Sequence, residues 1–209
     1  MKTYCIIMLS MVFVSCTKPI FKSKWVKQNS PEKFIVKFET TKGNFEIEVV
    51  REWSPKAADR FYQLVKHHFY NNTLFYRVVP KFVAQFGNSD TATTSKWKNF
   101  KVADEKVIYG NKKGSISFAR GGKETRGREL FINLHDNSFL DTLSYEGVKG
   151  FPAFGNVTKG MEVIDSIYGG YGDNTMNKLD GLYKNRTQFL KEFPNLDVIK
   201  KAYLRKTHQ

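Results

Sequence analysis

A short stretch of the sequence, FYRVVPKFVAQFGN at residues 75–88, places two polar side chains among apolar and aromatic ones. Arg77 and Gln85 are the polar members, and Phe82 and Val83 lie between them. A guanidinium stays charged in a protein, so an arginine in apolar surroundings needs partners. Arg77 is therefore either a structural ion-pair partner or a side chain that points into a pocket and meets a ligand there.

A second apolar group could complete such a pocket. It lies in ELFINLHDNSFLD, residues 129–141, and contains Phe131, Phe139 and Leu140. A pocket built from both groups would hold one guanidinium and one amide at its rim, with no acid, base or nucleophile of the usual kind. Such a pocket suits a reaction that needs none of these, and rotation about an Xaa-Pro peptide bond is one.

The physical chemistry of this rotation fits an arginine beside an apolar pocket. The bond turns slowly because the amide is conjugated. A donor to the prolyl nitrogen in the twisted state would localise the lone pair and bind that state better than the planar ground states. Lowering a barrier of roughly 18–20 kcal/mol by about 7 kcal/mol gives an acceleration on the order of 10⁵.

Other kinds of site find little support in the sequence. The two cysteines, Cys5 and Cys16, are both near the N-terminus, which leaves the rest of the chain without a disulfide or a thiol nucleophile. The four histidines show no metal-site spacing, and no serine lies in a Gly-x-Ser-x-Gly elbow. We therefore expect no metal and no cofactor.

The chain is strongly basic, with 34 Lys and Arg against 20 Asp and Glu and a formal net charge of +14. Such a charge can attract nucleic acid, anionic lipid or acidic proteins. The lysines are scattered, however, and neither zinc-finger spacing nor a recognition helix is evident. We interpret the charge as a solvated basic surface and expect no nucleic-acid partner.

The N-terminal residues MKTYCIIMLSMVFVSC have the pattern of a secretory leader, with a lysine, an apolar run and small residues before Cys16. The run is short for a transmembrane helix. Its end resembles a bacterial lipobox, in which the cysteine is acylated; plain secretion is the alternative. We expect a leader over 1–15, a lipidated N-terminus and tether over 16–33, and one domain over 34–209. This predicts a lipoprotein of the bacterial cell envelope, membrane-anchored through Cys16 and facing the periplasm.

The elements that must position the pocket are mostly short strands. Residues 33–50 alternate apolar and polar side chains about a turn at 41–43, which predicts a hairpin. Residues 54–70 predict a helix with Ser54 as its N-cap, and residues 158–168 a short helix capped by Thr158. Further strands are predicted over residues 74–79, 82–87, 114–120, 129–134 and 151–157. This pattern favours a β-barrel or sandwich with helical plugs. The periodicity of residues 196–206 fits a strand or a helix equally well.

Four segments in register resemble the cyclophilin-type peptidyl-prolyl isomerases. FYRVVPKFVAQFGN is similar to FHRVIPxFMxQGGD, GSISFARGG to GxLSMAR, ELFINLHDNSFLD to QFFIxxxDxxxLD, and FPAFGNVTKGMEVIDSI to VFGxVxxGMxVVDxI. The resemblance runs from about Phe34 to Ile167. It implies a mainly β fold, a closed eight-stranded antiparallel barrel with two capping helices. Residues 196–206 would then be the closing strand, and residues 171–194 an insertion before it.

The resemblance also implies roles for single residues. Arg77 takes the place of the catalytic arginine, and Gln85 that of the glutamine that positions the arginine and the substrate backbone. The proline-pocket positions are Phe82, Val83, Phe131 and Leu140. The segment that pairs with the peptide backbone is Ala119, Arg120 and Gly121. Three further substrate positions carry unusual residues, which are Glu129 for Gln, Phe139 for Trp and Phe151 for His or Tyr. The carboxylate of Glu129 could pair with Arg77 or with Arg128.

The implied function is peptidyl-prolyl cis-trans isomerisation of exported proteins, with proline-containing polypeptides as partners. The unusual residues motivate an alternative, a catalytically weak or inactive module that binds proline-containing peptides. A third possibility is a structural lipoprotein that keeps the barrel only as a scaffold.

Overall fold

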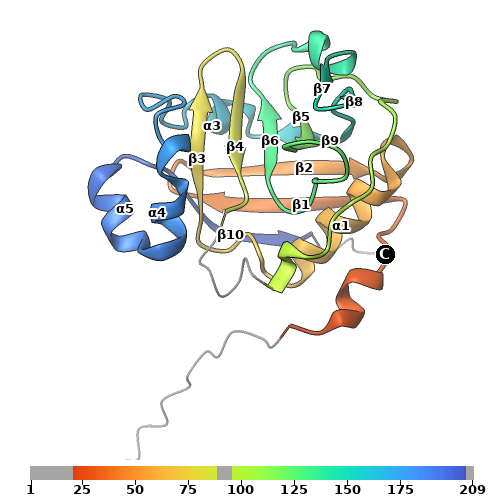
Figure 1. The fold of residues 1–209 in the computed structure, drawn as a ribbon, viewed down its shortest axis with the longest axis horizontal. Helices are drawn as coiled ribbons and strands as arrows, with labels where there is room; N and C mark the ends of the chain where they lie inside the picture. The colour runs from red at the N-terminus through yellow and green to blue at the C-terminus, as the bar shows by residue number, and fades with distance from the viewer. Residues whose placement is uncertain (1–20, 89–95, 206–209) are drawn as a thin grey trace, which may run out of the picture.

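The structure, a computed structural model, describes residues 21–88 and 96–205. Eight strands close into one barrel in the order β1-β10-β3-β4-β6-β5-β9-β2, and every neighbouring pair is antiparallel (Figure 1). The barrel strands are β1 (Lys33–Thr40), β2 (Asn44–Val50), β3 (Thr73–Val79), β4 (Val83–Phe86), β5 (Ser115–Phe118), β6 (Leu130–Asn133), β9 (Ala153–Lys159) and β10 (Val198–Leu204). This confirms the expected closed eight-stranded antiparallel barrel. The ambiguous C-terminal stretch is the closing strand, because β10 pairs with both β1 and β3.

The predicted first hairpin shows how alternation builds the barrel. Strands β1 and β2 bury every second side chain, and these inward residues include Phe38 and Phe45, whose rings stack 4.6 Å apart. Helix α1 (Pro55–Lys66) packs against the barrel and adds Phe61 to the same core, and the five-residue helix α3 (Met161–Asp165) adds Ile164. The interior is filled with side chains, so a binding site has to lie on the outer surface.

A β-bulge in β3 determines which of its side chains lie on the outer surface of the barrel. The register with β4 shifts between Phe75 and Arg77, so Phe75 pairs with Phe86 while Arg77 pairs with Gln85. Phe75 packs in the barrel core, whereas Tyr76 belongs to a second apolar cluster and Arg77 reaches Gln85 and Phe82. A bulge re-aims side chains in this way, and here it turns two consecutive residues away from the core.

The start of α1 differs from the prediction. Ser54 holds the N-cap position, but its side chain makes no capping bond and its Oγ donates to Glu105 Oε2 at 2.5 Å. The carboxylate of Glu105 instead accepts from the backbone N–H groups of Lys56 at 2.8 Å and Ala57 at 3.2 Å. Glu105 is thus a cap supplied from 51 residues along the chain, and an anion is favourable at a helix N-terminus.

The predicted cap of the second helix is also wrong. Thr158 lies inside β9, which runs on to Lys159 because that residue still pairs with Glu46 of β2. Gly160 holds the N-cap position of α3 with a φ of 79°. A Cβ added to this residue would lie 2.4 Å from the carbonyl oxygen of Asn44, so glycine is required there.

The N-terminal segment is more ordered than the expected tether. The rings of Phe21 and Trp25 pack against the barrel core, and Trp25 lies in the 3-10 helix η1 (Ser23–Lys27). The Trp25 ring stacks on His67 with centroids 3.7 Å apart, and Gln63 Nε2 donates to the carbonyls of Val26 and Gln28. Residues within the expected tether of 16–33 thus contact the core and α1. Cys16 and the predicted leader lie outside the described residues.

The stacked His67 makes stability depend on pH. Burial, reinforced by the charges of Lys66 and His68, lowers the pKa of His67 to about 4. The unfolded chain, with a histidine pKa near 6.5, therefore binds more protons between pH 4 and 6.5. The contribution of His67 to stability is complete above about pH 6.5 and is lost as the pH falls towards 4.

Urea unfolding of the wild type and of His67→Gln, compared from pH 4 to 7.5, measures this loss. We expect the two curves of unfolding free energy to converge as the pH falls. The wild type loses the contribution of His67 over this range, whereas the variant has no histidine at this position and loses nothing there. A His135→Gln variant, altered at an exposed histidine, should follow the wild type. Parallel curves for wild type and His67→Gln would contradict the assignment.

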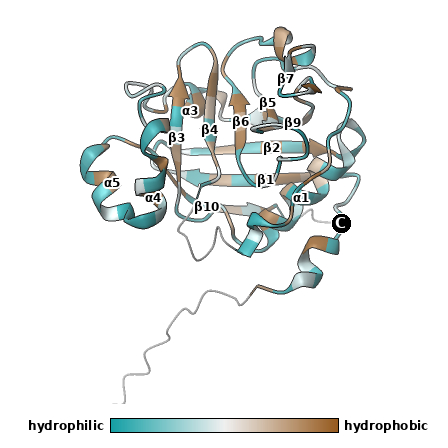
Figure 2. Cartoon of the chain, in the orientation of Figure 1, coloured by the Kyte–Doolittle hydropathy of each residue, from teal (hydrophilic) through white to brown (hydrophobic). Residues whose placement is uncertain are grey.

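Residues 171–194 form a small helical unit beside the barrel. Helices α4 (Leu179–Lys184) and α5 (Arg186–Glu192) lie next to β3 (Figure 1). Figure 2 shows hydrophobic residues along β3, β4 and β6, while much of α4 and α5 is hydrophilic. The buried contact with the barrel is a second apolar cluster made of Leu74, Tyr76, Leu182, Phe189, Phe193 and Leu196. Whether this unit is an insertion relative to the family stays a prediction. In the described parts of the chain, no helix is long and apolar enough to cross a membrane.

Candidate functional site

Three neighbouring strands bring the two polar residues of the predicted pocket next to its apolar floor. Arg77 of β3 pairs with Gln85 of β4, and Gln85 pairs with Phe131 of β6. Arg77 Nη1 donates to Gln85 Oε1 at 3.1 Å. Residues 54 positions apart in the sequence thus lie in one row across the outside of the barrel.

The predicted apolar residues gather around this row. Val83, Phe131 and Leu140 form a buried cluster, and Phe82, Ala119 and Phe151 pack against it. Phe139, in the 3-10 helix η3 (Ser138–Asp141), is 54% exposed, and its ring stacks 6.0 Å from that of Phe82. Phe139 therefore lies at the rim rather than in the floor.

Arg77 has an ion-pair partner, as the first interpretation of the opening motif requires, and it also lies at the edge of the apolar cluster, against Phe82. Its Nε donates to Asp173 Oδ1 at 2.5 Å, and its guanidinium carbon lies 5.6 Å from the centroid of the Phe82 ring. The side chain is 21% exposed. Contacts to Asp173, Gln85 and Phe82 fix the plane of the guanidinium and leave part of its Nη edge for a ligand.

Asp173 is the partner of Arg77 that sequence reasoning missed. Gly172 forms an antiparallel bridge with Val78, and the buried Thr175 donates its hydroxyl to the carbonyl of Tyr76. The backbone is thus tied to β3 on both sides of Asp173. No motif marks this aspartate in the sequence, since its role depends on a contact over 96 residues.

A chain of hydrogen bonds continues from Gln85 away from the pocket. Gln85 Nε2 donates to the Tyr76 hydroxyl at 2.7 Å, and that hydroxyl donates to Glu129 Oε2 at 2.8 Å. Burial and then the negative charge of Glu129 raise the pKa of Tyr76 well above its usual value, so the hydroxyl keeps its proton. These hydrogen bonds orient the Gln85 amide so that its oxygen faces Arg77.

Glu129 meets only one of its two expected partners. Its Oε1 lies 3.5 Å from Arg128 Nη2, while the contacts of Arg77 in the described chain are to Gln85 and Asp173. The negative charge that balances Arg77 therefore comes from Asp173 of the helical unit and not from Glu129.

The segment expected to pair with a peptide backbone is partly occupied within the chain. Ala119 N donates to the carbonyl of Glu129, and Gly121 N donates to Thr125 Oγ1. Arg120 donates to the carbonyls of Gly150 and Val148, and its guanidinium carbon lies 3.9 Å from the centroid of the Phe151 ring. Arg120 thus contacts Phe151 at the edge of the apolar cluster.

The arrangement is suited to binding an apolar ring beside a fixed cation. Among residues 21–88 and 96–205, no cluster of three or more His, Cys, Asp or Glu side chains could hold a metal ion. A guanidinium fixed at the edge of an apolar pocket can stabilise charge on an atom of a bound ligand, because water is excluded from the pocket.

Comparisons with known proteins agree with this geometry. Residues 35–184 match the family model described as cyclophilin type peptidyl-prolyl cis-trans isomerase/CLD. A peptidyl-prolyl cis-trans isomerase of Acinetobacter baylyi is 35% identical over 135 residues, which cover 64% of this chain and 71% of that protein. Peptidyl-prolyl cis-trans isomerase A of Dickeya dadantii is 37% identical over 130 residues, covering 61% and 67%.

Solved structures show the same fold. The crystal structure of a cyclophilin type peptidyl-prolyl cis-trans isomerase of Cryptosporidium parvum superposes with a TM-score of 0.58 at 21% identity, covering 84% of this chain and 99% of that one. A second structure of that protein, in the presence of the dipeptide Ala-Pro, gives a TM-score of 0.57 at 20% identity, covering 83% and 99%.

Proposed function

The chain belongs to the cyclophilin-type peptidyl-prolyl cis-trans isomerases, and we propose that it catalyses this reaction with Arg77 as the catalytic residue. The observation that supports the proposal is the placement of Arg77, bonded to Gln85 and lying against Phe82 at the edge of the apolar cluster. No acid, base or cofactor is needed, since the reaction breaks no covalent bond.

The proposed mechanism follows from the contacts of the site. The proline ring of the substrate enters the cluster of Val83, Phe131 and Leu140, which excludes water from one side of the amide. The Nη edge of Arg77 then donates to the prolyl nitrogen as the bond twists and the lone pair localises. Gln85 and Asp173 hold the guanidinium in place, so little reorganisation is required as the twisted state forms.

The proposed substrates are Xaa-Pro bonds of exported proteins, and the proposed location is the bacterial cell envelope. Both rest on the leader-like N-terminus and on Cys16 as a lipid anchor facing the periplasm. Cell fractionation of wild type and Cys16→Ser tests the anchor. Release of the variant from the membrane fraction supports it, and equal distribution of the two proteins contradicts it.

The ion pair between Arg77 and Asp173 motivates a second candidate function, a module that binds proline-containing peptides with little catalysis. In that case the carboxylate would neutralise the cation that catalysis needs. The two candidates differ in the sign of an Asp173→Ala effect. If Asp173 positions Arg77, its removal lowers catalysis, whereas if it suppresses Arg77, its removal raises catalysis.

We expect wild-type protein to accelerate cis-to-trans isomerisation of a short Xaa-Pro peptide and Asp173→Ala to lower kcat/KM about two- to fivefold. This range corresponds to about 0.4–1 kcal/mol, the upper part of the roughly 0.2–1 kcal/mol typical of exposed ion pairs, and the Asp173 side chain is 66% exposed. Asp165→Ala, which removes the exposed partner of Lys113, is the matched control and should leave the rate unchanged. An inactive wild type together with an active Asp173→Ala would favour the binding module.

A further inference from the structure

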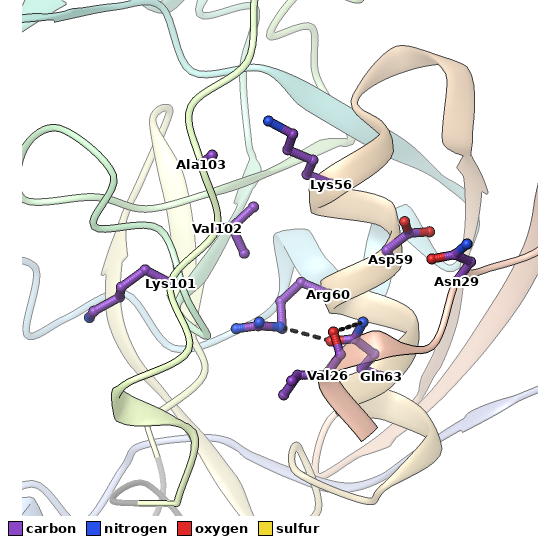
Figure 3. A pocket seen from close by; sticks show the side chains of 9 residues that line it. All are labelled: Val26, Asn29, Lys56, Asp59, Arg60, Gln63, Lys101, Val102 and Ala103. Carbon is purple, nitrogen blue, oxygen red and sulfur yellow. Dashed lines mark hydrogen bonds between the residues drawn. The ribbon is translucent and has the colours of Figure 1, made fainter. Parts of the chain in front are cut away.

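A pocket lies between α1 and the segment of residues 101–103, and none of the residues that line it belongs to the apolar cluster beside Arg77. Its volume is about 210 Å³, and residues of α1, of the N-terminal segment and of 101–103 line it (Figure 3). A water molecule takes about 30 Å³ in the liquid, so the space can hold a small polyatomic ligand. The isomerase mechanism proposed above does not use this pocket.

Arg60 is the buried cation of this pocket. The residue is 6% exposed, and its guanidinium donates to Gln63 Oε1 at 3.0 Å and to the carbonyls of Phe100 and Gly127. Figure 3 shows the side chain reaching from α1 towards residues 101–103. In the described chain no carboxylate forms an ion pair with it, and burial lowers its pKa to about 10.

Within residues 21–88 and 96–205, the partners of Arg60 are all uncharged. They are one amide oxygen, two backbone carbonyls and the ring of Trp97, whose centroid lies 5.6 Å from the guanidinium carbon. No described residue accepts from its second terminal nitrogen, Nη2. A buried cation without a counter-charge is costly, and an anion that reached it would reduce that cost.

The carboxylates near the pocket are already engaged by two other arginines. Both oxygens of Asp59 accept from Arg51, at 2.9 and 3.0 Å. Asp104 and Glu105 lie 3.8 and 3.0 Å from nitrogens of Arg126. The negative charge of the neighbourhood is therefore balanced without Arg60.

Two exposed lysines add to the positive charge at the rim. Lys56 lines the pocket from α1 and Lys101 from the opposite segment. The pKa of Lys101 is lowered, first by burial and then by the charge of Arg128. A flexible lysine can turn towards a ligand without disturbing the fold.

We propose that this pocket is a binding site for a small oxyanion, a phosphate or carboxylate group, with Arg60 as the inner donor and Lys56 and Lys101 at the rim. Arginine suits this role because its planar N–H donors match the oxygens of such groups. The site is separate from the isomerase site, so it stands whether or not the mechanism of catalysis is correct.

The test is a titration of the whole chain with inorganic phosphate, followed by amide chemical shifts at constant ionic strength. We expect saturable shifts in α1 and residues 101–103, with a dissociation constant on the order of millimolar. Lys101→Ala should weaken binding several-fold, and Arg60→Gln should weaken it at least tenfold. Lys200→Ala, which removes an exposed lysine of β10 outside the pocket, should bind as the wild type does.

Separate titrations with acetate and chloride complete the design. Saturation by phosphate, by acetate or by both supports the site and identifies which oxyanion it prefers. Equal shifts with chloride, shifts that never saturate, or unchanged binding in Lys101→Ala would each overturn it. If Arg60→Gln does not fold, Lys56→Ala and Lys101→Ala decide the question, because both residues are exposed and the fold does not depend on them.

Discussion

We expect Arg77→Ala to lose about 10²–10³-fold in kcat/KM for a short Xaa-Pro peptide. This is the usual cost of removing one donor that stabilises charge in a transition state. The loss should appear in kcat as well as in kcat/KM, because the prolyl nitrogen accepts the bond only in the twisted state. The measurement is the cis-to-trans rate of the peptide, with protein that begins after Cys16.

Two further variants make this result interpretable. Arg77→Lys keeps a positive charge but lacks the planar fork that contacts Gln85 and Asp173 together, so its rate should lie between wild type and Arg77→Ala. Arg205→Ala removes a half-exposed arginine that pairs with Glu46 at 3.0 Å, and it should be fully active. A folded Arg77→Ala protein with wild-type kcat/KM would refute the catalytic role of Arg77.

The largest effect on stability is expected for Glu105→Ala, which we expect to lower the free energy of unfolding by about 3–5 kcal/mol. Glu105 is the partner of Arg126, whose side chain is 1% exposed, and breaking a buried ion pair by removing one member costs about this much. Two nitrogens of Arg126, Nε and Nη1, are buried without a hydrogen-bond partner in the described chain. Asp104, at 3.8 Å, would be the only remaining counter-charge among the described residues.

The same carboxylate also caps α1, and this adds to the loss. Its oxygens accept from the N–H groups of Lys56 and Ala57, and losing a side-chain cap costs about 0.5–2 kcal/mol. Urea unfolding of Glu105→Ala, Glu105→Gln and Glu162→Ala separates the contributions. The amide of Glu105→Gln can still accept at the helix but carries no charge, so its stability should be intermediate.

Glu162 lies exposed in the first turn of α3 and provides the control, whose replacement should change the unfolding free energy by less than about 0.5 kcal/mol. A loss below 1 kcal/mol for Glu105→Ala would show that the pair with Arg126 and the cap of α1 contribute little to stability.

These two predictions differ in how far the sequence alone leads to them. Arg77 stands out because a charged residue interrupts an apolar run, and alternation along a strand fixes which side chains share a face. The grouping of Val83, Phe131 and Leu140 follows instead from the family resemblance of the motifs around them, since Leu140 lies in η3 and not in a strand. Glu105, by contrast, lies in a polar stretch with no periodicity, and its two partners are in other elements.

The sequence alone was misleading where local rules compete with tertiary contacts. Ser54 and Thr158 are good N-cap residues by type. A distant carboxylate nevertheless caps the first helix, and the second helix begins only after Lys159, because that residue still pairs in the sheet. The polar, lysine-rich stretch after Cys16 resembles a tether, yet Trp25 within it packs on His67. Burial of a few aromatic rings outweighs average composition there.

The periodicity of the sequence by itself determined a set of short strands, because alternation along a strand is a local property. The family resemblance then predicted the closed barrel and its closing strand, which the structure confirms, and a site at Arg77 and Gln85, which stays a prediction. Only the tertiary structure decided what surrounds them. The bulge at Tyr76, the ion pair of Arg77 with Asp173 and the contacts of Arg60 with distant backbone carbonyls all depend on which segments meet. Contacts over 96 residues, such as that of Arg77 with Asp173, are set by how the whole chain closes, and neither composition nor periodicity carries that information.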